Sequence, residues 1–437
     1  MEIAPVVIAA LLGTILGGFV LALPGVGAAG LAAVLLARFG TDPRVLAEPE
    51  LLFIFFSALT VSGSFASIIP AFFFSAPGPA TVFLTVPGER CRSEGRSLRG
   101  ALDAGRGCLA GVLLLAALSP LFLYLYEPLQ MLVFRHLRWA AAVLVVWMLG
   151  GEAVFHLRRA RGERRKTRYR ALRLAPLIFL LAGIFGLLAG HCRRFPAGGS
   201  RYAALIGLFL IPPLVRRILA PEGAAPKKET SLKPLPDEPF ALSGALAGGA
   251  GGLLAALLPG IGAGPGALVA GHLAPGKRER AFLFSQGMVQ SLLAATAFLV
   301  FFLPARPFIR SQVSRTIAPY HQPGGFLASY ILIAGVILAS GALAYLIFHL
   351  TARLARTLTR GVSPRLLSAA IVLFVTGLTC LLYGPGRLPV FFTGICLGSL
   401  PLVFGCRRSN LFGFFLLPYL IFLAGWHEPL SALLGLR

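Results

Sequence analysis

Acidic side chains are scarce in this sequence of 437 residues, which has 16 Asp and Glu against 40 Lys and Arg. None of the acids lies in the middle of a long apolar run, and Glu152, near one end of such a run, comes closest. A relay of buried carboxylates that passes protons is therefore poorly supported. Charged residues of both signs make up only 13% of the chain, about half the share of ordinary soluble domains, and this excludes that class.

Several signatures of chemistry are also missing. The six cysteines form no CxxC pair and do not cluster with histidine, so the sequence predicts neither a zinc site nor a disulfide framework. Walker A, HExxH and GxSxG motifs are absent, which leaves ATP-driven transport by this chain alone and the common hydrolase reactions without support. We therefore expect no enzyme activity and no bound cofactor or metal, with Na⁺ as a candidate coupling ion.

Apolar residues make up 57% of the chain, and its mean hydropathy is +0.82. A membrane-spanning helix needs about 20 apolar residues. Five runs approach or exceed that length: Trp139–Leu157, Leu174–Cys192, Phe326–Leu350, Leu366–Tyr383 and Leu411–Trp426. The sequence predicts an all-helical, multi-pass protein of the cell membrane with about ten to twelve spans.

The net charge of +24 resides in short loops between apolar runs, which favours contact with the lipid bilayer and not with nucleic acid. Residues 158–173 carry nine basic side chains against one acid and are expected to be cytoplasmic, as are residues 89–106 and 351–365. The number of spans that separate these loops then places equivalent parts of the two halves on opposite sides of the membrane. This favours two repeats of inverted topology, a common plan of secondary transporters.

The sequence also repeats itself. The stretch LALPGVGAAG (Leu21–Gly30) resembles LLPGIGAGPG (Leu257–Gly266), at an offset of 235 residues. A polar segment rich in proline, lysine and glutamate, residues 220–240, lies between the two copies. We predict a first transmembrane repeat over residues 1–219, a linker over 220–240, and a second repeat over 241–437.

Each copy places proline and glycine inside an apolar run, where a helix should be most regular. Proline costs about 3 kcal/mol in a helix interior and glycine about 1 kcal/mol, so these positions predict helix breaks. Broken half-helices in transporters expose N–H groups to anions and carbonyl groups to Na⁺. A close-packing glycine patch is the alternative reading. The predicted binding residues at the breaks are Pro24, Gly25, Gly27, Pro259, Gly260 and Gly262.

A second candidate segment, Ser62–Gly88, contains three Pro/Gly breaks that divide it into runs too short to span, which predicts a re-entrant hairpin. FSALTVSG at 56–63 matches FSQGMVQS at 284–291 with an offset of 228. Buried polar side chains here would line an aqueous site, although the serines also fit hydrogen bonds within their own helices. The candidates are Ser64, Ser67, Ser75, Pro77, Gly78, Gln286 and Gln290.

These motifs resemble the large membrane subunit of tripartite tricarboxylate transporters, and within that family its archaeal-type homologues. The resemblance covers Gly13–Gly111 well and Gly248–Arg315 moderately. It implies a permease for small organic anions, such as di- or tricarboxylates, that is driven by an ion gradient in symport. It also implies an extracytoplasmic binding protein and a small membrane subunit as partners; the oligomeric state stays open, a homo-oligomer included.

The sequence departs from the family pattern in two places. Bacterial members have Asn-Thr-Pro-Gly where this chain has Ser75-Ala76-Pro77-Gly78, and archaeal-type members often have Pro-Gly-Ile-His-Pro-Asn where it has PGVGAA at 24–29. A membrane enzyme or flippase that acts on lipid-linked phosphates is the alternative function, and a scaffold subunit inactive by itself is a third. The polar candidates for the enzyme are Glu89, Arg90, Arg92, Glu94, Arg96 and Asp103.

Overall fold

The structure is a computed structural model that describes residues 3–39, 48–158, 165–191, 197–220, 242–258, 262–274, 279–302, 312–319, 326–426 and 429. Every regular element in these ranges is a helix, and ten of the helices are long and apolar enough to cross a membrane. The prediction of an all-helical, multi-pass membrane protein is confirmed for this part of the chain.

The chain forms two compact units, each assembled from two separate stretches of sequence. The first unit contains residues 1–130 and 222–362, and the second contains 131–221 and 363–437. Each unit thus takes one stretch from either side of the predicted linker. Apart from Ala220, that linker lies outside the described residues, and the division into repeats at 1–219 and 241–437 stays a prediction.

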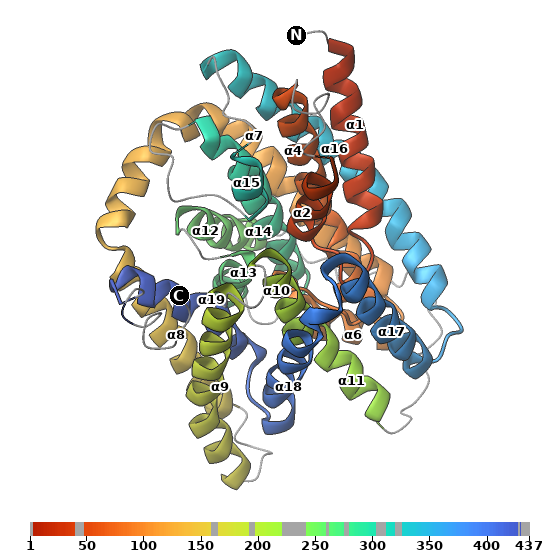
Figure 1. The fold of residues 1–437 in the computed structure, drawn as a ribbon, viewed down its shortest axis with the longest axis vertical. Helices are drawn as coiled ribbons and strands as arrows, with labels where there is room; N and C mark the ends of the chain where they lie inside the picture. The colour runs from red at the N-terminus through yellow and green to blue at the C-terminus, as the bar shows by residue number, and fades with distance from the viewer. Residues whose placement is uncertain are drawn as a thin grey trace. The chain divides into compact units, whose positions relative to one another are not determined.

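Two similar groups of helices build the first unit. In both groups a helix, a short break and a second helix precede a long buried helix: α1, α2 and α4 in one, α12, α13 and α14 in the other (Figure 1). α1 packs along α4, and α12 packs along α14. The helices of this unit are α1 (Ile3–Val20), α2 (Ala28–Phe39), α4 (Pro49–Ala66), α5 (Ile68–Phe73), η1 (Val82–Leu84), α6 (Thr85–Ser93), α7 (Ser97–Arg135, which leaves the unit after Gln130), α12 (Leu242–Leu257), α13 (Ala263–Leu273), α14 (Glu279–Leu299), η3 (Val300–Phe302), α15 (Gln312–Ile317) and α16 (Phe326–Thr359).

The second unit contains α8 (Leu137–Arg158), α9 (Arg165–His191), α10 (Ala197–Leu205), the π-helix η2 (Ile206–Leu210), α11 (Ile211–Leu219), α17 (Pro364–Tyr383), η4 (Pro385–Arg387), α18 (Leu388–Phe404), η5 (Arg408–Phe412) and α19 (Gly413–Leu423). The predicted span Leu411–Trp426 is wrong in its bounds. Its first two residues belong to a 3₁₀ turn, and the α-helix that follows has 11 residues. Buried Glu152 accepts hydrogen bonds from the Arg407 N–H at 2.9 Å and from Asn410 Nδ2 at 3.3 Å, which ties this turn to α8.

α7 differs most from the sequence-based expectation. We predicted a cytoplasmic loop over residues 89–106, but a helix of 39 residues begins at Ser97 and continues to Arg135. Small residues explain the early start, because Gly100, Ala101 and Ala104 are buried and let neighbouring elements approach the helix closely. Asp103, which we placed in the loop, therefore lies inside a helix and is 1% exposed.

The segment Ser62–Gly88 contains one loop where three breaks were predicted. Pro70 lies in the first turn of α5, and Pro87 lies in the first turn of α6, positions at which the missing proline N–H is not needed. Pro70 still ends the preceding helix: its ring conflicts with the carbonyl of Ala66, and α4 stops there. The loop occupies residues 74–81, and α6 folds back so that Gly88 lies against Phe72 of α5. A re-entrant position in the membrane stays a prediction.

Candidate substrate and ion site

The first predicted break separates α1 from α2. Between them the N–H of Leu23 donates to the Val20 carbonyl at 3.1 Å, and Gly25 has a φ of +84°, a conformation that favours glycine. Pro24 is buried. Gly27 is exposed and directly precedes α2, so it lies beside the first-turn N–H groups, which have no partner within the helix.

The second predicted break separates α12 from α13. Pro259 and Gly260 lie outside the described residues. Gly262 is exposed and extended, with a ψ of −177°, and α13 begins at the next residue. A Cβ atom added to Gly262 would meet no atom of a described residue within 4 Å, and the same holds for Gly27. Both groups of helices therefore place a glycine with open space beside it before a helix N-terminus.

Glycines also hold each broken helix against its long neighbour. A Cβ at Gly13 of α1 would lie 3.1 Å from Ala58 Cβ of α4, and one at Gly248 of α12 would lie 2.8 Å from Met288 Cβ of α14. Ala58 and Met288 are 230 positions apart, whereas the sequence match predicts an offset of 228. When α4 and α14 are matched by their packing, the offset between equivalent residues is therefore two residues larger than the offset given by their sequences.

Ser67 and Gln290 connect the two groups. The Ser67 hydroxyl donates to Gln290 Oε1 at 2.9 Å, with the Ser64 carbonyl as a second acceptor at 3.0 Å. Gln290 is 5% exposed, and its Nε2 has no hydrogen-bond partner within the described part of the chain. A buried donor left without an acceptor costs about 1–3 kcal/mol. This amide can therefore receive an oxygen atom of a ligand.

Each break packs in a hydrophobic cluster with the long helix of its own group. Val26 of the first break packs in a cluster with Ala66, the residue before Ser67. On the other side, Ala263 at the start of α13 packs in a cluster with Val289, the residue before Gln290. Each break thus packs against α4 or α14, and the Ser67–Gln290 hydrogen bond links these two long helices.

The two groups of helices differ in this polar pair: the positions equivalent to Ser67 and Gln290 do not form one. With the packing offset of 230, Gln290 corresponds to Thr60 and Ser67 corresponds to Ala297. The Thr60 hydroxyl donates to the Phe56 carbonyl of its own helix at 2.7 Å, and alanine offers no polar atom in its side chain. The equivalent location therefore has no side-chain hydrogen bond of this kind.

Two other candidates make hydrogen bonds that stabilise local structure. Gln286 Nε2 donates to the Ala267 carbonyl at 2.9 Å, which fixes α14 against α13. The Ser64 hydroxyl donates to the Val61 carbonyl at 2.6 Å within α4, the structural role that we weighed for the serines. Both residues lie near the Ser67–Gln290 pair in sequence, but their hydrogen bonds are made to neighbouring backbone carbonyl groups.

The remaining candidates lie in the loop after α5. Ser75 is fully buried with a φ of +55°, and its hydroxyl accepts a hydrogen bond from Arg92 Nη2 at 2.8 Å. The Gly78 N–H donates to Thr81 Oγ1 at 3.0 Å, and Pro77 precedes it in the same loop. Arg92 also donates to the Phe73 carbonyl at 2.6 Å, so the loop is held mainly by an arginine that the transport hypothesis had not included.

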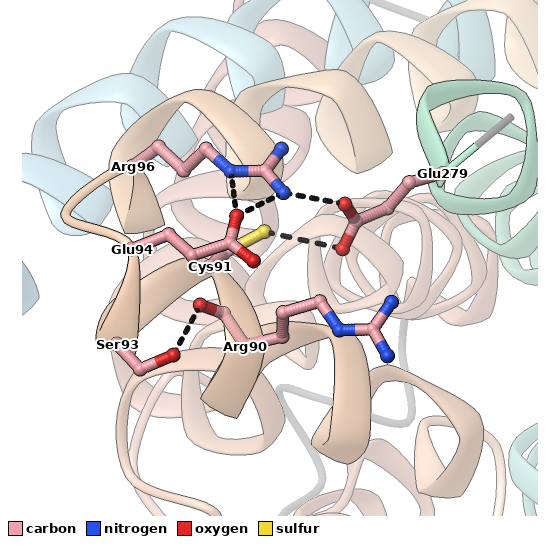
Figure 2. Close-up of polar contacts among 6 residues, drawn as sticks. All are labelled: Arg90, Cys91, Ser93, Glu94, Arg96 and Glu279. Atoms are coloured by element: carbon pink, nitrogen blue, oxygen red, sulfur yellow. Dashed lines mark hydrogen bonds and ion pairs between the residues drawn. The ribbon is translucent and has the colours of Figure 1, made fainter.

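An ionic cluster joins the end of α6 to the start of α14. Figure 2 shows Arg96 between two carboxylates, bonded to Glu94 and to Glu279, the latter at 2.7 Å. Buried Asp103 of α7 similarly accepts from Arg106 Nη1 at 2.7 Å and from Arg280 Nε at 3.2 Å. Each of these acids has an arginine partner.

Those contacts do not favour the enzyme hypothesis. Glu94, Arg96 and Asp103 form ion pairs, Arg92 supports the loop after α5, and Glu89 and Arg90 are exposed on α6. Acid–base catalysis would require a carboxyl group poised near a substrate, and ion-paired carboxylates fit a structural role better. Within the described ranges, no group of three or more His, Cys, Asp or Glu side chains could hold a metal ion.

We predict that Cys91 resists alkylation in the native protein. Burial, together with the negative charge of Glu279, raises the pKa of this thiol to about 12, and its Sγ lies 3.7 Å from Glu279 Oε1. The reactive thiolate is then about a thousandfold rarer near neutral pH than for a thiol of pKa 9. Mass spectrometry after N-ethylmaleimide treatment at pH 7–9 should find Cys91 unmodified, and modified once SDS unfolds the chain.

The variant Glu279→Gln tests the cause of this shift. Removing the negative neighbour lowers the thiol pKa and should raise the labelling rate at a given pH, while burial keeps the rate below that of the unfolded chain. Rapid labelling of native Cys91 at pH 7 would contradict the buried, ion-paired arrangement of Figure 2.

The chain is similar to a known protein family. The family model described as the tripartite tricarboxylate transporter TctA family matches residues 7–413. Neither the curated proteins nor the solved structures that were compared with the chain include a match.

Proposed function

The chain belongs to the tripartite tricarboxylate transporter TctA family, and on that premise we propose that it is the permease of a secondary transporter for a small organic anion. The proposed substrate is a di- or tricarboxylate, and the proposed driving force is a gradient of Na⁺ or H⁺. One observation carries the proposal: a buried, incompletely bonded polar pair, Ser67–Gln290, joins the two long helices against which the helix breaks pack.

The chemistry of these groups suits an anion. The N-termini of α2 and α13 offer unpaired N–H groups and the positive ends of helix dipoles, and each such end favours a nearby anion by about 0.3–1 kcal/mol, more when partly buried. Gln290 Nε2 adds a further donor. The glycines at 27 and 262 leave space beside both helix ends, so a carboxylate can approach the backbone.

The proposal includes partners. Tripartite transporters of this kind use an extracytoplasmic binding protein and a small membrane subunit, and we propose that this chain works with both. The binding protein would deliver the anion, and this chain would carry it through the bilayer.

Uptake by proteoliposomes tests the function. The purified chain, with its small subunit and binding protein where these are co-purified, is reconstituted and supplied with radiolabelled di- and tricarboxylates under imposed Na⁺ or proton gradients. We expect uptake above that of empty liposomes for at least one carboxylate, accelerated by one of the two gradients. Absence of uptake of every carboxylate would contradict the substrate class, and uptake indifferent to both gradients would contradict the coupling.

We predict that Gln290→Leu lowers carboxylate uptake by about tenfold to a hundredfold. The variant removes a hydrogen bond to a charged ligand, an interaction of about 1.5–3 kcal/mol. Gln290→Glu should be at least as harmful, because it retains the size of the side chain but presents a negative oxygen to the anion. Initial rates across a range of substrate concentrations measure the effect.

Thr60→Val provides the matched control for this prediction. Thr60 occupies the corresponding position of α4, and its one hydrogen bond among the described residues is to its own helix, so uptake should remain within about twofold of the unmodified protein. Equal losses in the Thr60 and Gln290 variants would show that both act through packing and not through the ligand.

A further inference from the structure

A second polar location lies where α12 ends. The Tyr126 hydroxyl of α7 donates to the Ala256 carbonyl at 2.9 Å, and Tyr126 is 4% exposed. Ala256 belongs to the last turn of α12, whose final four carbonyl groups have no partner within the helix. α7 therefore contacts the carbonyl end of a helix directly at the second break.

α7 and α12 run in the same direction at this contact. Leu114 of α7 lies 3.8 Å from the Cβ position of Gly249, and twelve residues later Tyr126 reaches Ala256, seven residues after Gly249. Gln130 follows Tyr126 by four residues, which places it on the same face of α7 and about 6 Å farther along the axis. Pro128 lies between the two residues, and α7 continues through it to Arg135, so Gln130 is about one turn beyond the tyrosine that contacts α12.

Packing alone does not explain why the polar side chain of Gln130 is buried. The residue is 0% exposed, and neither its Oε1 nor its Nε2 has a hydrogen-bond partner in the part of the chain that the structure describes. Burying an amide without hydrogen bonds costs several kcal/mol in an apolar environment. A fully buried amide without a partner, one turn along α7 from the tyrosine that bonds the last turn of α12, is consistent with a place for a ligand.

The sign of the surrounding charge identifies the kind of ligand. Glu127, three residues before Gln130 and adjacent to it on the helix surface, is half-buried and forms no ion pair with a described residue. The C-terminal end of α12 adds the negative end of a helix dipole. Carboxylate, amide and carbonyl oxygens are the ligands of hard cations such as Na⁺.

We propose that Gln130, Glu127 and the last-turn carbonyl groups of α12 form a Na⁺ site. Gln130 Oε1 and the Glu127 carboxylate would supply side-chain oxygens, while Tyr126 holds α12 in place. This inference rests on the proposed function only in that a Na⁺ site would couple transport to the ion gradient; the binding of Na⁺ itself requires no substrate.

Na⁺ binding to the purified, detergent-solubilised chain tests the site without transport. Na⁺ replaces choline or K⁺ at constant ionic strength, and both the thermal unfolding temperature and retention of radioactive ²²Na⁺ are measured. We expect saturable stabilisation by Na⁺ that K⁺ does not reproduce. Gln130→Ala and Glu127→Gln should raise the half-saturating Na⁺ concentration by about tenfold or more.

Two further variants separate ligation from structure. Gln130→Glu retains an oxygen at the site and should bind Na⁺ at least as tightly as the unmodified protein, an outcome that a purely structural role does not predict. Glu89→Gln removes the same charge from an exposed position of α6 and should leave Na⁺ binding unchanged. If Gln130→Ala does not fold, Glu127→Gln and Gln130→Glu still decide the question.

The outcomes distinguish this site from the proposed function. Unmodified protein that shows no preference for Na⁺ over K⁺, or variants with unchanged half-saturation, would overturn the site. If the Gln130 and Glu127 variants still take up carboxylate with the same dependence on Na⁺ concentration as the unmodified protein, the site is overturned and the transport proposal is retained. Na⁺ binding that is weakened by the variants, in a protein without carboxylate uptake, would retain the site and overturn the transport proposal.

Discussion

Gly27→Leu and Gly262→Leu should each reduce carboxylate uptake by roughly a hundredfold while the protein remains folded. The expectation combines two observations: each glycine directly precedes a helix N-terminus, and a side chain added there meets open space. A leucine would occupy the space in which the anion approaches the N–H groups of α2 or α13. Displacing a bound substrate by about 1 Å is enough to lower a rate a hundredfold.

Folding should survive both substitutions. Neither position requires a positive φ, in contrast to Gly25, where any side chain would strain the backbone whatever the space. The loss of glycine before a helix costs no more than about 1 kcal/mol. Size-exclusion chromatography in detergent should therefore show the same monodisperse peak as the unmodified protein.

Gly377→Leu is the matched control. Gly377 lies in α17 of the second unit, is exposed, and has nothing within 4 Å of its Cβ position. Leucine there should improve helix propensity and leave uptake intact. Unimpaired uptake in Gly27→Leu and Gly262→Leu would mean that the breaks pack helices and do not bind substrate.

Gly287→Leu should prevent the protein from folding. A Cβ at Gly287 of α14 would collide with the Ala104 carbonyl of α7, and a Cβ at Gly107 of α7 would collide with the Phe284 carbonyl of α14. Two backbones in contact cannot yield as a flexible side chain can, so the helices would have to separate. Overpacking costs about 1–3 kcal/mol even when the surroundings can adjust.

Gly287→Ala provides a graded version of the test. It should lower the unfolding temperature by several degrees, whereas Gly335→Ala on α16, with nothing within 4 Å, should leave it unchanged or raise it. Nanoscale differential scanning fluorimetry of the purified variants measures both unfolding temperatures. If Gly287→Leu were as stable as Gly335→Ala, then α7 and α14 would not be in backbone contact.

The sequence indicates the helix breaks because proline and glycine act locally. Pro24 and Gly25 interrupt the apolar run by their own backbone chemistry, and the positive φ of Gly25 agrees with that reading. Pro70 shows the limit of the same argument. The proline lies within the first turn of α5, and the interruption falls earlier, at Ser67, because a proline disturbs the carbonyl four residues before it.

Other features depend on tertiary contacts that no local pattern encodes. Residues 97–106 resemble a basic loop, yet they form a helix because Gly100 and Ala104 let other elements pack closely against it. The hydrogen bond of Ser67 to Gln290 joins residues 223 positions apart. Its existence depends on the register between α4 and α14, which differs by two residues from the match between their sequences.

That register bears on how many molecules the proposed permease would carry at a time. An exact duplication of sequence would give the substrate two equal energy wells, one contributed by each copy. Here the amide of Gln290 stands on one side, and the other side has Thr60 and Ala297 in the corresponding places. If the amide binds the anion, the duplicated framework supplies a single well, and each transport cycle moves one anion.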